Sequence, residues 1–175
     1  MPQAEGTGQG IHRLRGSRNL PGEVVLGRNS QVFVSLGGNL GNLRANLARA
    51  RTKIAELDCT DLESASAQRL TEPVGVVGQP EFLNQVLRLS TGLEPQALLD
   101  CLLEIEKGMG RVRTSRWGPR IIDLDILFYG ALRLETPSLV LPHPEVWVRP
   151  FFLDMIGELD STFLQEWEEF RGERG

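Results

Sequence analysis

The sequence contains few of the residues that build most metal and redox sites. Its two cysteines, Cys59 and Cys101, form no CxxC pair, which argues against a zinc ribbon or a redox pair. Its two histidines, His12 and His143, are too few for a histidine-based metal site. It also has no apolar run long enough to cross a bilayer, so we expect no membrane partner.

An excess of positive charge is missing too. The net charge is −4, so the molecule has no general attraction for nucleic acid. The N-terminal region has no apolar segment typical of a secretory signal, which favours a cytoplasmic location. The 175 residues, 41% of them hydrophobic, suffice for one domain with a core. We therefore expect a cytoplasmic monomer that binds small molecules.

Residues 1–29 are rich in Gly, Arg, Asn and Gln and show little periodicity. We interpret them as a flexible N-terminal extension. Residues 30–175 are then expected to form a single domain.

Hydrophobic periodicity predicts alternating strands and helices after residue 30. Strands are expected at 31–36, 61–70, 82–90 and 121–128. Helices are expected at 43–57, where Asn42 or Asn39 provides the cap, and from Pro95 to Gly108 or Gly110. Residues 151–159 and 162–167 are also predicted to be helical. This order predicts an α+β, ferredoxin-like βαββαβ sandwich with a C-terminal extension.

Side chains alternate between the two faces of a strand, so each predicted strand divides into two sets. In the last strand Ile122, Leu124, Ile126 and Phe128 share one face, while Asp123, Asp125 and Leu127 share the other. In the third strand Leu83, Leu87 and Leu89 lie opposite Phe82, Asn84 and Val86. With the two helices on the apolar face, the open face is expected to carry two carboxylates, an amide and a ring, and to be the active site.

Carboxylates on alternate strand residues lie about 7 Å apart. A hard cation between them would remove their repulsion, and Mg²⁺ favours carboxylate and phosphate oxygens. Two such ions clamp a phosphate group under attack. The nearby arginines Arg111, Arg113, Arg116 and Arg120 then suit phosphate oxygens. The alternative is that Asp123 and Asp125 are solvated and form salt bridges to these arginines.

Four segments together resemble one enzyme family. They are SLGGNLGN (35–42), TEPVGVVGQPEFLNQV (71–86), GRVRTSRWGPRIIDLDIL (110–127) and LPHPEVWVRPFFL (141–153). The chain is similar, over about residues 31–160, to the hydroxymethyl-dihydropterin pyrophosphokinases of folate biosynthesis. The resemblance implies transfer of pyrophosphate from ATP to 6-hydroxymethyl-7,8-dihydropterin, with release of AMP and a requirement for two Mg²⁺ ions.

The resemblance also implies roles for individual residues. Asp123 and Asp125 would bind the metal ions. Arg111, Arg120 and Asp125 would be the catalytic residues, with Asp125 helping to accept a proton. The ATP-binding residues would be Glu106, Arg111, Arg113, Trp117, Arg120, His143 and Arg149, with Trp117 in a mobile loop. The pterin-binding residues would be Thr71, Val74, Phe82, Asn84 and Phe151.

Other interpretations remain open at this point. A non-catalytic ferredoxin-like module would bind a nucleotide or RNA on the open sheet face, although two acids there would repel a phosphate backbone. A degenerate relative would bind ATP without turnover. Without the resemblance, Phe82 and Phe151 would be ordinary core aromatics, and Glu106 would lie on a solvated helix face.

Overall fold

The computed structural model describes residues 29–73, 78–112 and 118–172, with side chains described up to residue 169. The predicted extension 1–29 therefore lies outside the described residues except for Asn29. The same is true of Val74, Arg113, Arg116 and Trp117. No helix in the described ranges is long and apolar enough to span a membrane.

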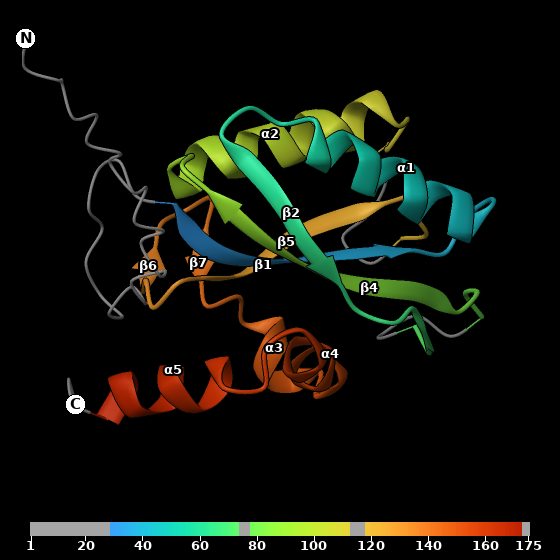
Figure 1. The fold of residues 1–175 in the computed structure, drawn as a ribbon. Helices are drawn as coiled ribbons and strands as arrows, with labels where there is room; N and C mark the ends of the chain where they lie inside the picture. Colours follow the sequence, from blue (N-terminus) through green and yellow to red (C-terminus); the bar gives the residue numbers. More distant parts are fainter. Residues whose placement is uncertain (1–28, 74–77, 113–117, 173–175) are drawn as a thin grey trace, which may run out of the picture.

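A five-stranded antiparallel sheet forms the centre of the molecule (Figure 1). Its strands are β1 (Ser30–Gly38), β2 (Thr60–Ala65), β3 (Arg69–Thr71), β4 (Phe82–Thr91) and β5 (Asp123–Tyr129). The order across the sheet is β2-β4-β1-β5, and β3 also pairs with β4. Every neighbouring pair is antiparallel. The prediction of an α+β protein with an antiparallel sheet is confirmed.

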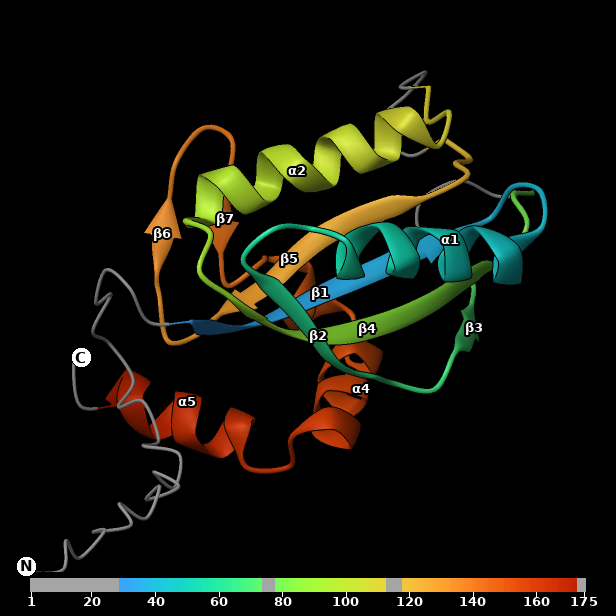
Figure 2. The same ribbon diagram turned by 45° about the horizontal axis from the view of Figure 1, so that its top comes forward.

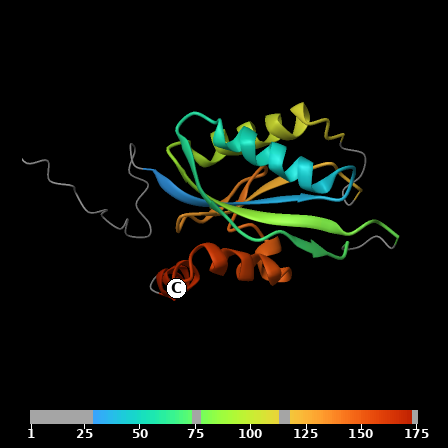
Figure 3. The ribbon, with the colours of Figure 1, turned by 45° about the vertical axis from the view of Figure 1, so that its right-hand side comes forward.

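Helices cover both faces of this sheet (Figures 1 and 3). On one face lie α1 (Leu43–Ala55) and α2 (Pro95–Gly108). On the other lie α3 (Glu145–Val148), α4 (Phe151–Leu159) and α5 (Phe163–Gly172). A small hairpin of β6 (Leu134–Glu135) and β7 (Val140–Leu141) stands beside the start of α2, where Ser138 Oγ donates to Gln96 Oε1 at 2.8 Å (Figure 2).

The helix ends follow from local chemistry. Asn42 caps α1, because its Oδ1 accepts a hydrogen bond from the Ala45 N–H at 3.1 Å. Pro95 begins α2, where its missing N–H costs nothing. After α2, Gly110 has a φ of +90°, a conformation that glycine adopts without strain.

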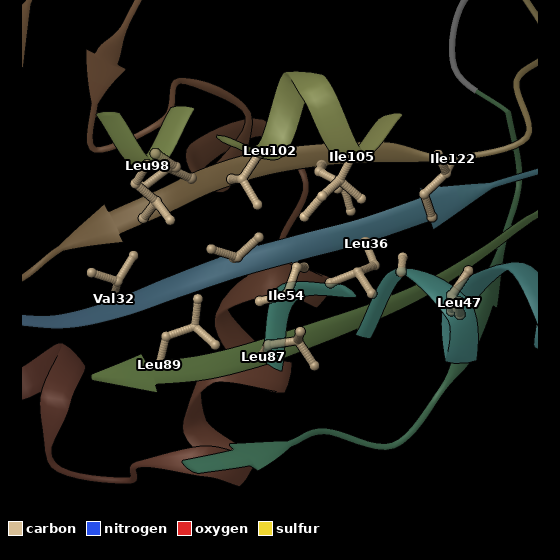
Figure 4. Close-up of a cluster of buried hydrophobic side chains, with 14 of the residues drawn as sticks. Val32, Leu36, Leu47, Ile54, Leu87, Leu89, Leu98, Leu102, Ile105 and Ile122 are labelled. Atoms are coloured by element: carbon tan, nitrogen blue, oxygen red, sulfur yellow. The ribbon is translucent and has the colours of Figure 1, made fainter. Parts of the chain in front are cut away.

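Two hydrophobic clusters lie on opposite sides of the sheet. Figure 4 shows the larger one, in which Val32, Leu36, Leu87 and Leu89 of the sheet meet side chains of α1 and α2. The smaller cluster joins Phe33, Val86 and Leu127 to α4 and α5. The expected alternation along β4 is thereby confirmed, with Leu83, Leu87 and Leu89 opposite Val86.

The prediction for Phe128 is wrong. Val34 pairs with Ile126 but Phe33 pairs with Phe128, so Leu127 is an extra residue in β5. This β-bulge reverses the alternation beyond it. Phe128 therefore joins the smaller cluster, where its ring centroid lies 5.2 Å from that of Phe163.

The face expected to be open is partly covered by the C-terminal helices. Arg69 of β3 forms an ion pair with Glu158 of α4, and Arg88 of β4 contacts Asp160 at 3.4 Å. The single strand expected at 61–70 is two strands, because residues 66–68 interrupt it and β3 pairs with the beginning of β4. That pairing places Thr71 opposite Phe82.

Candidate active site

Two adjacent rows of the sheet bring the predicted polar residues together. Gly37 of β1 pairs with Asp123 of β5 on one side and with Asn84 of β4 on the other. One row further, Ser35 pairs with Asp125 and with Val86. Directly paired residues of an antiparallel sheet share a face, so both acids and Asn84 lie on the side that carries α4.

Gly37 leaves space between the acid and the amide. A Cβ atom there would lie 3.0 Å from Asn84 Oδ1, which is a tight contact. The sheet surface is therefore low at Gly37, between the side chains of Asp123 and Asn84, and we call this surface the low floor. Such a floor suits a flat molecule lying across the strands.

Asp123 forms salt bridges with both arginines. Arg111 Nη1 lies 2.5 Å from Asp123 Oδ1, and Arg120 Nη1 lies 2.5 Å from Asp123 Oδ2. The three side chains are 14–22% exposed. The salt bridges that the alternative interpretation expected are therefore present at Asp123. The three side chains are largely buried, however, and are not solvated as that interpretation expected.

Asp125 is different, because it makes no hydrogen bond or salt bridge within the described part of the chain. Burial raises its pKa to about 7, and the negative charges of Asp123 and Glu106 act in the same direction. Arg111 and Arg120 oppose this shift without cancelling it. A carboxyl in this condition can hold a proton near neutral pH or attract a cation.

The donor set fits a divalent ion that also binds a phosphorylated ligand. Two carboxylates stand close together, and one of them has no protein partner among the described residues. No cluster of three or more His, Cys, Asp or Glu that could hold a metal alone occurs in those residues. Oxygen ligands beyond Asp123 and Asp125 would have to come from substrate and water, as is common for Mg²⁺.

Glu106, at the end of α2, is 2% exposed. Its Oε1 accepts a hydrogen bond from the Leu124 N–H at 2.7 Å and also contacts Arg111 Nη1. Burial raises its pKa, although the Leu124 N–H and Arg111 act to lower it. The interpretation of Glu106 as a residue on a solvated helix face is wrong, because the helix end turns it towards β5.

Asn39 is a residue of the site that the sequence did not single out. It is 3% exposed, and its Oδ1 accepts a hydrogen bond from the Arg120 N–H at 2.8 Å. Its Nδ2 donates to Gln79 Oε1 and to the Pro80 carbonyl, both at 3.2 Å. Asn39 therefore joins the segment before β4 to the arginine segment before β5.

The available signal for Asn39 was its place after two glycines at the end of a strand. The glycine at position 38 is needed because a Cβ atom there would lie 2.4 Å from the Ile121 carbonyl oxygen. The two segments approach so closely that only glycine fits. The capping role considered for Asn39 belongs to Asn42.

Three of the predicted pterin residues, Thr71, Phe82 and Asn84, lie together on the β3–β4 pair beside the low floor. Asn84 Nδ2 donates to Thr71 Oγ1 at 2.8 Å and to the Phe82 carbonyl at 3.2 Å. The Arg120 guanidinium lies 5.7 Å from the centroid of the Phe82 ring. Within the described ranges, Phe82 and Phe151 make no ring contact with each other. Phe151 packs against Phe152 instead, with ring centroids 4.3 Å apart.

Two further predicted residues, His143 and Arg149, lie near the two acids at the C-terminal edge of the site. Arg149 has its guanidinium 4.8 Å from the Phe151 ring centroid, a cation–π contact. Its Nε is buried and has no hydrogen-bond partner among the described residues, and burial lowers the pKa of Arg149. His143 Nδ1 accepts a hydrogen bond from the Glu145 N–H at 3.2 Å, and burial lowers its pKa as well. The Arg149 guanidinium therefore keeps an N–H that an anion can accept.

A surface pocket of about 600 Å³ lies elsewhere, between the β6–β7 hairpin and two tryptophans. Its lining includes Arg133, Glu135, Trp147 and Trp167, and none of the predicted site residues. We assign the chemistry to the acid and arginine cluster, because the charges and the unpaired carboxyl are found there.

Comparison with known proteins identifies the family of the chain. Residues 33–161 match the model of the 7,8-dihydro-6-hydroxymethylpterin-pyrophosphokinase family. A Pseudomonas aeruginosa 2-amino-4-hydroxy-6-hydroxymethyldihydropteridine pyrophosphokinase is 41% identical over 129 residues, which are 74% of this chain and 80% of that protein. The mitochondrial folate synthesis bifunctional protein of Pisum sativum is 38% identical over 153 residues, 85% of this chain.

The chain spans only 30% of the length of that bifunctional pea protein. The structure of Plasmodium falciparum HPPK-DHPS with pteroate superposes with a TM-score of 0.56 at 14% identity, covering 78% of this chain and 41% of that one. At this identity the likeness concerns the fold. The family match and the Pseudomonas relative show that the chain belongs to the 7,8-dihydro-6-hydroxymethylpterin-pyrophosphokinase family.

Proposed function

We propose that the protein transfers the pyrophosphoryl group of ATP to 6-hydroxymethyl-7,8-dihydropterin, giving AMP and the pterin diphosphate for folate biosynthesis. The observation that carries this proposal is the pairing of Asp123 and Asp125 on one sheet face with Arg111 and Arg120 against them. Family membership supports the same reaction. The alternative, a non-catalytic nucleotide- or RNA-binding module, is not favoured, because the named relatives are pyrophosphokinases.

Asp123 and Asp125 would hold two Mg²⁺ ions. Such ions, when bound, neutralise phosphate charge and help to align the reacting groups. The raised pKa of Asp125 supports a place for a cation, since positive charge there would offset the repulsion from Asp123 and Glu106.

Arg111 and Arg120 would bind the phosphates of ATP. Each guanidinium already contacts a carboxylate oxygen of Asp123, so a phosphate oxygen can replace that partner without a new geometry. Asn39 holds the backbone of Arg120 in place. His143 and Arg149 would contact the nucleotide from the opposite edge. Arg113 and Trp117 are proposed as ATP-binding residues from the family resemblance alone, which would also place Glu106 in this set.

The pterin would lie over the low floor between Asp123 and Asn84. The Asn84 Oδ1 offers an acceptor to a heterocycle edge, while its Nδ2 donates to Thr71 Oγ1 and to the Phe82 carbonyl. Phe82 and Phe151 would stack on the two faces of the pterin. Thr71 fixes the Asn84 amide through their hydrogen bond at 2.8 Å. Val74 is proposed for the same pocket from the resemblance.

Asp125 would accept the proton of the pterin hydroxymethyl group at a carboxylate oxygen. Asp125 shares its sheet face with Asn84, so its carboxylate lies on the side where the pterin would bind. The reaction depends mostly on positioning and charge neutralisation, so this transfer adds to the rate without being its main source.

We further infer a ferredoxin-like arrangement, since two strand–helix–strand units share one sheet and α1 and α2 lie on one face. Residues 30–175 would form one pyrophosphokinase domain and residues 1–29 an extension. We expect the protein to act as a monomer in the cytoplasm.

Incubation of the purified protein with ATP, Mg²⁺ and 6-hydroxymethyl-7,8-dihydropterin tests the reaction. AMP and the pterin diphosphate should form together, and only when metal and pterin are both present. ADP as the nucleotide product would show a simple kinase and refute the proposed transfer. Omission of the pterin is the matched control for ATP hydrolysis.

A further inference from the structure

We propose that Glu106 is a positioning residue, which acts through Arg111 and the acid-bearing strand rather than by touching ATP. This proposal rests on the proposed function, since Arg111 is assigned to the phosphates. The family resemblance alone would place Glu106 among the nucleotide contacts.

The surroundings of Glu106 leave little of it available to a ligand. Its side chain is 3% exposed, and its Oε1 faces Arg111 Nη1 and the Leu124 N–H. A buried carboxylate is tolerated only when charge and hydrogen bonds satisfy it. Both partners come from the protein, so Oε1 is accounted for without a nucleotide.

One of these contacts anchors the strand that carries both acids. Leu124 lies between Asp123 and Asp125, and β5 is an edge strand of the five-stranded sheet. Edge strands leave backbone groups without a strand partner. The Glu106 carboxylate accepts the Leu124 N–H at 2.7 Å and so ties the end of α2 to the point between the acids.

The other contact holds Arg111. The Arg111 guanidinium touches both Glu106 Oε1 and Asp123 Oδ1, and the Arg111 N–H donates to the Glu106 carbonyl at 3.1 Å. When Arg111 exchanges Asp123 for a phosphate oxygen, Glu106 remains as its second partner. The guanidinium then keeps its position without reorganising, which is what electrostatic catalysis requires.

A double-mutant cycle separates positioning from direct contact. The variants are Glu106→Gln, Arg111→Ala and the double variant, each assayed for AMP formation with ATP, Mg²⁺ and the pterin. Glutamine keeps an acceptor for the Leu124 N–H and removes the charge that holds Arg111. We expect Glu106→Gln to lower kcat/KM about 10- to 100-fold. In the Arg111→Ala background the same change should cost no more than about twofold.

Glu104→Gln is the control, because Glu104 lies on the same helix and its contact, Lys107 at 3.4 Å, is exposed. It should match the wild type. If the losses of Glu106→Gln and Arg111→Ala multiply, Glu106 acts independently of Arg111 and the proposal is overturned. If Glu106→Gln merely damaged the fold, its loss in kcat/KM would also multiply with that of Arg111→Ala. The cycle therefore distinguishes a damaged fold from positioning.

The test still decides if the Glu106→Gln variant does not fold or if the wild type makes no AMP. If Glu106→Gln does not fold, as judged by its thermal transition, the same cycle is run with Glu106→Asp, which keeps the charge and shortens its reach. If the wild type makes no AMP, the proposed function fails. The same variants are then compared by their dissociation constants for α,β-methylene-ATP with Mg²⁺, measured by calorimetry. Binding losses that multiply there would refute the positioning role, and a loss confined to the background with Arg111 present would support it.

Discussion

Replacing Asn39 by alanine tests how the arginine segment is held. The change removes three side-chain hydrogen bonds, to the Arg120 N–H, Gln79 Oε1 and the Pro80 carbonyl. A neutral hydrogen bond contributes about 1 kcal/mol, and a buried N–H left without a partner costs about 1–3 kcal/mol. Because Asn39 is 3% exposed, water replaces these bonds poorly. We expect a loss of about 2–3 kcal/mol in the free energy of unfolding.

That loss corresponds to a fall of about 4–12 °C in the melting temperature. The activity should fall further than stability explains, because Arg120 loses the contact that positions its backbone. Small displacements of a charge-stabilising group cost about 10- to 100-fold in rate. AMP formation is measured well below the melting temperature of the variant, together with calorimetric unfolding.

Asn42→Ala is the matched control in the same segment. Asn42 caps α1 through an exposed hydrogen bond to the Ala45 N–H, and its loss should cost about 1 kcal/mol. This control should keep near-normal activity. Equal activity losses in Asn39→Ala and Asn42→Ala would refute the idea that Asn39 acts on Arg120. An unchanged melting temperature for Asn39→Ala would refute the hydrogen-bond assignment.

Three other perturbations give expectations of different kinds. Gly38→Ala should destabilise the fold by about 1–3 kcal/mol in thermal unfolding, since its Cβ would meet the Ile121 carbonyl oxygen at 2.4 Å; a wild-type melting temperature would contradict the close approach. Asp125→Asn should abolish AMP formation yet raise the melting temperature at pH 8 without metal. Burial raises the pKa of Asp125 to about 7, so its ionised form opposes folding above that pH; a lower melting temperature would show that the charge is stabilising. Burial tends to raise the pKa of Asp160, but hydrogen bonds from Gln31 and neighbouring groups outweigh it and hold that pKa below the ordinary value. This contribution is present above the ordinary aspartate pKa of about 4 and is lost as the pH falls through the lower folded value. Asp160→Asn should therefore show a smaller drop in melting temperature between pH 7 and pH 3 than the wild type, and an equal drop would count against the assignment.

Local pattern was enough for much of the fold. The cap at Asn42, the start of α2 at Pro95 and the terminal helices follow from residue chemistry within one or two turns. The alternation in β4 and in the first part of β5 was predictable for the same reason, because a regular strand has a period of two. The four segments that carry the family resemblance were also readable without a structure.

Two features of the fold depend on tertiary contacts and cannot be predicted from hydrophobic periodicity. The bulge at Leu127 depends on pairing with β1, so the face of Phe128 was not readable from β5 alone. The covering of the second sheet face likewise depends on contacts such as Arg88 with Asp160, 72 residues apart.

The sequence by itself determined that Asp123 and Asp125 share a face and that arginines stand close by in the chain. Only the tertiary structure decided how they divide: Asp123 is held by two arginines, while Asp125 stays without a partner in the described residues. It also turned Glu106 inwards to Arg111. The physical reason is that spacing sets the direction of a side chain, whereas its partners and its burial come from segments that meet only when the sheet has formed.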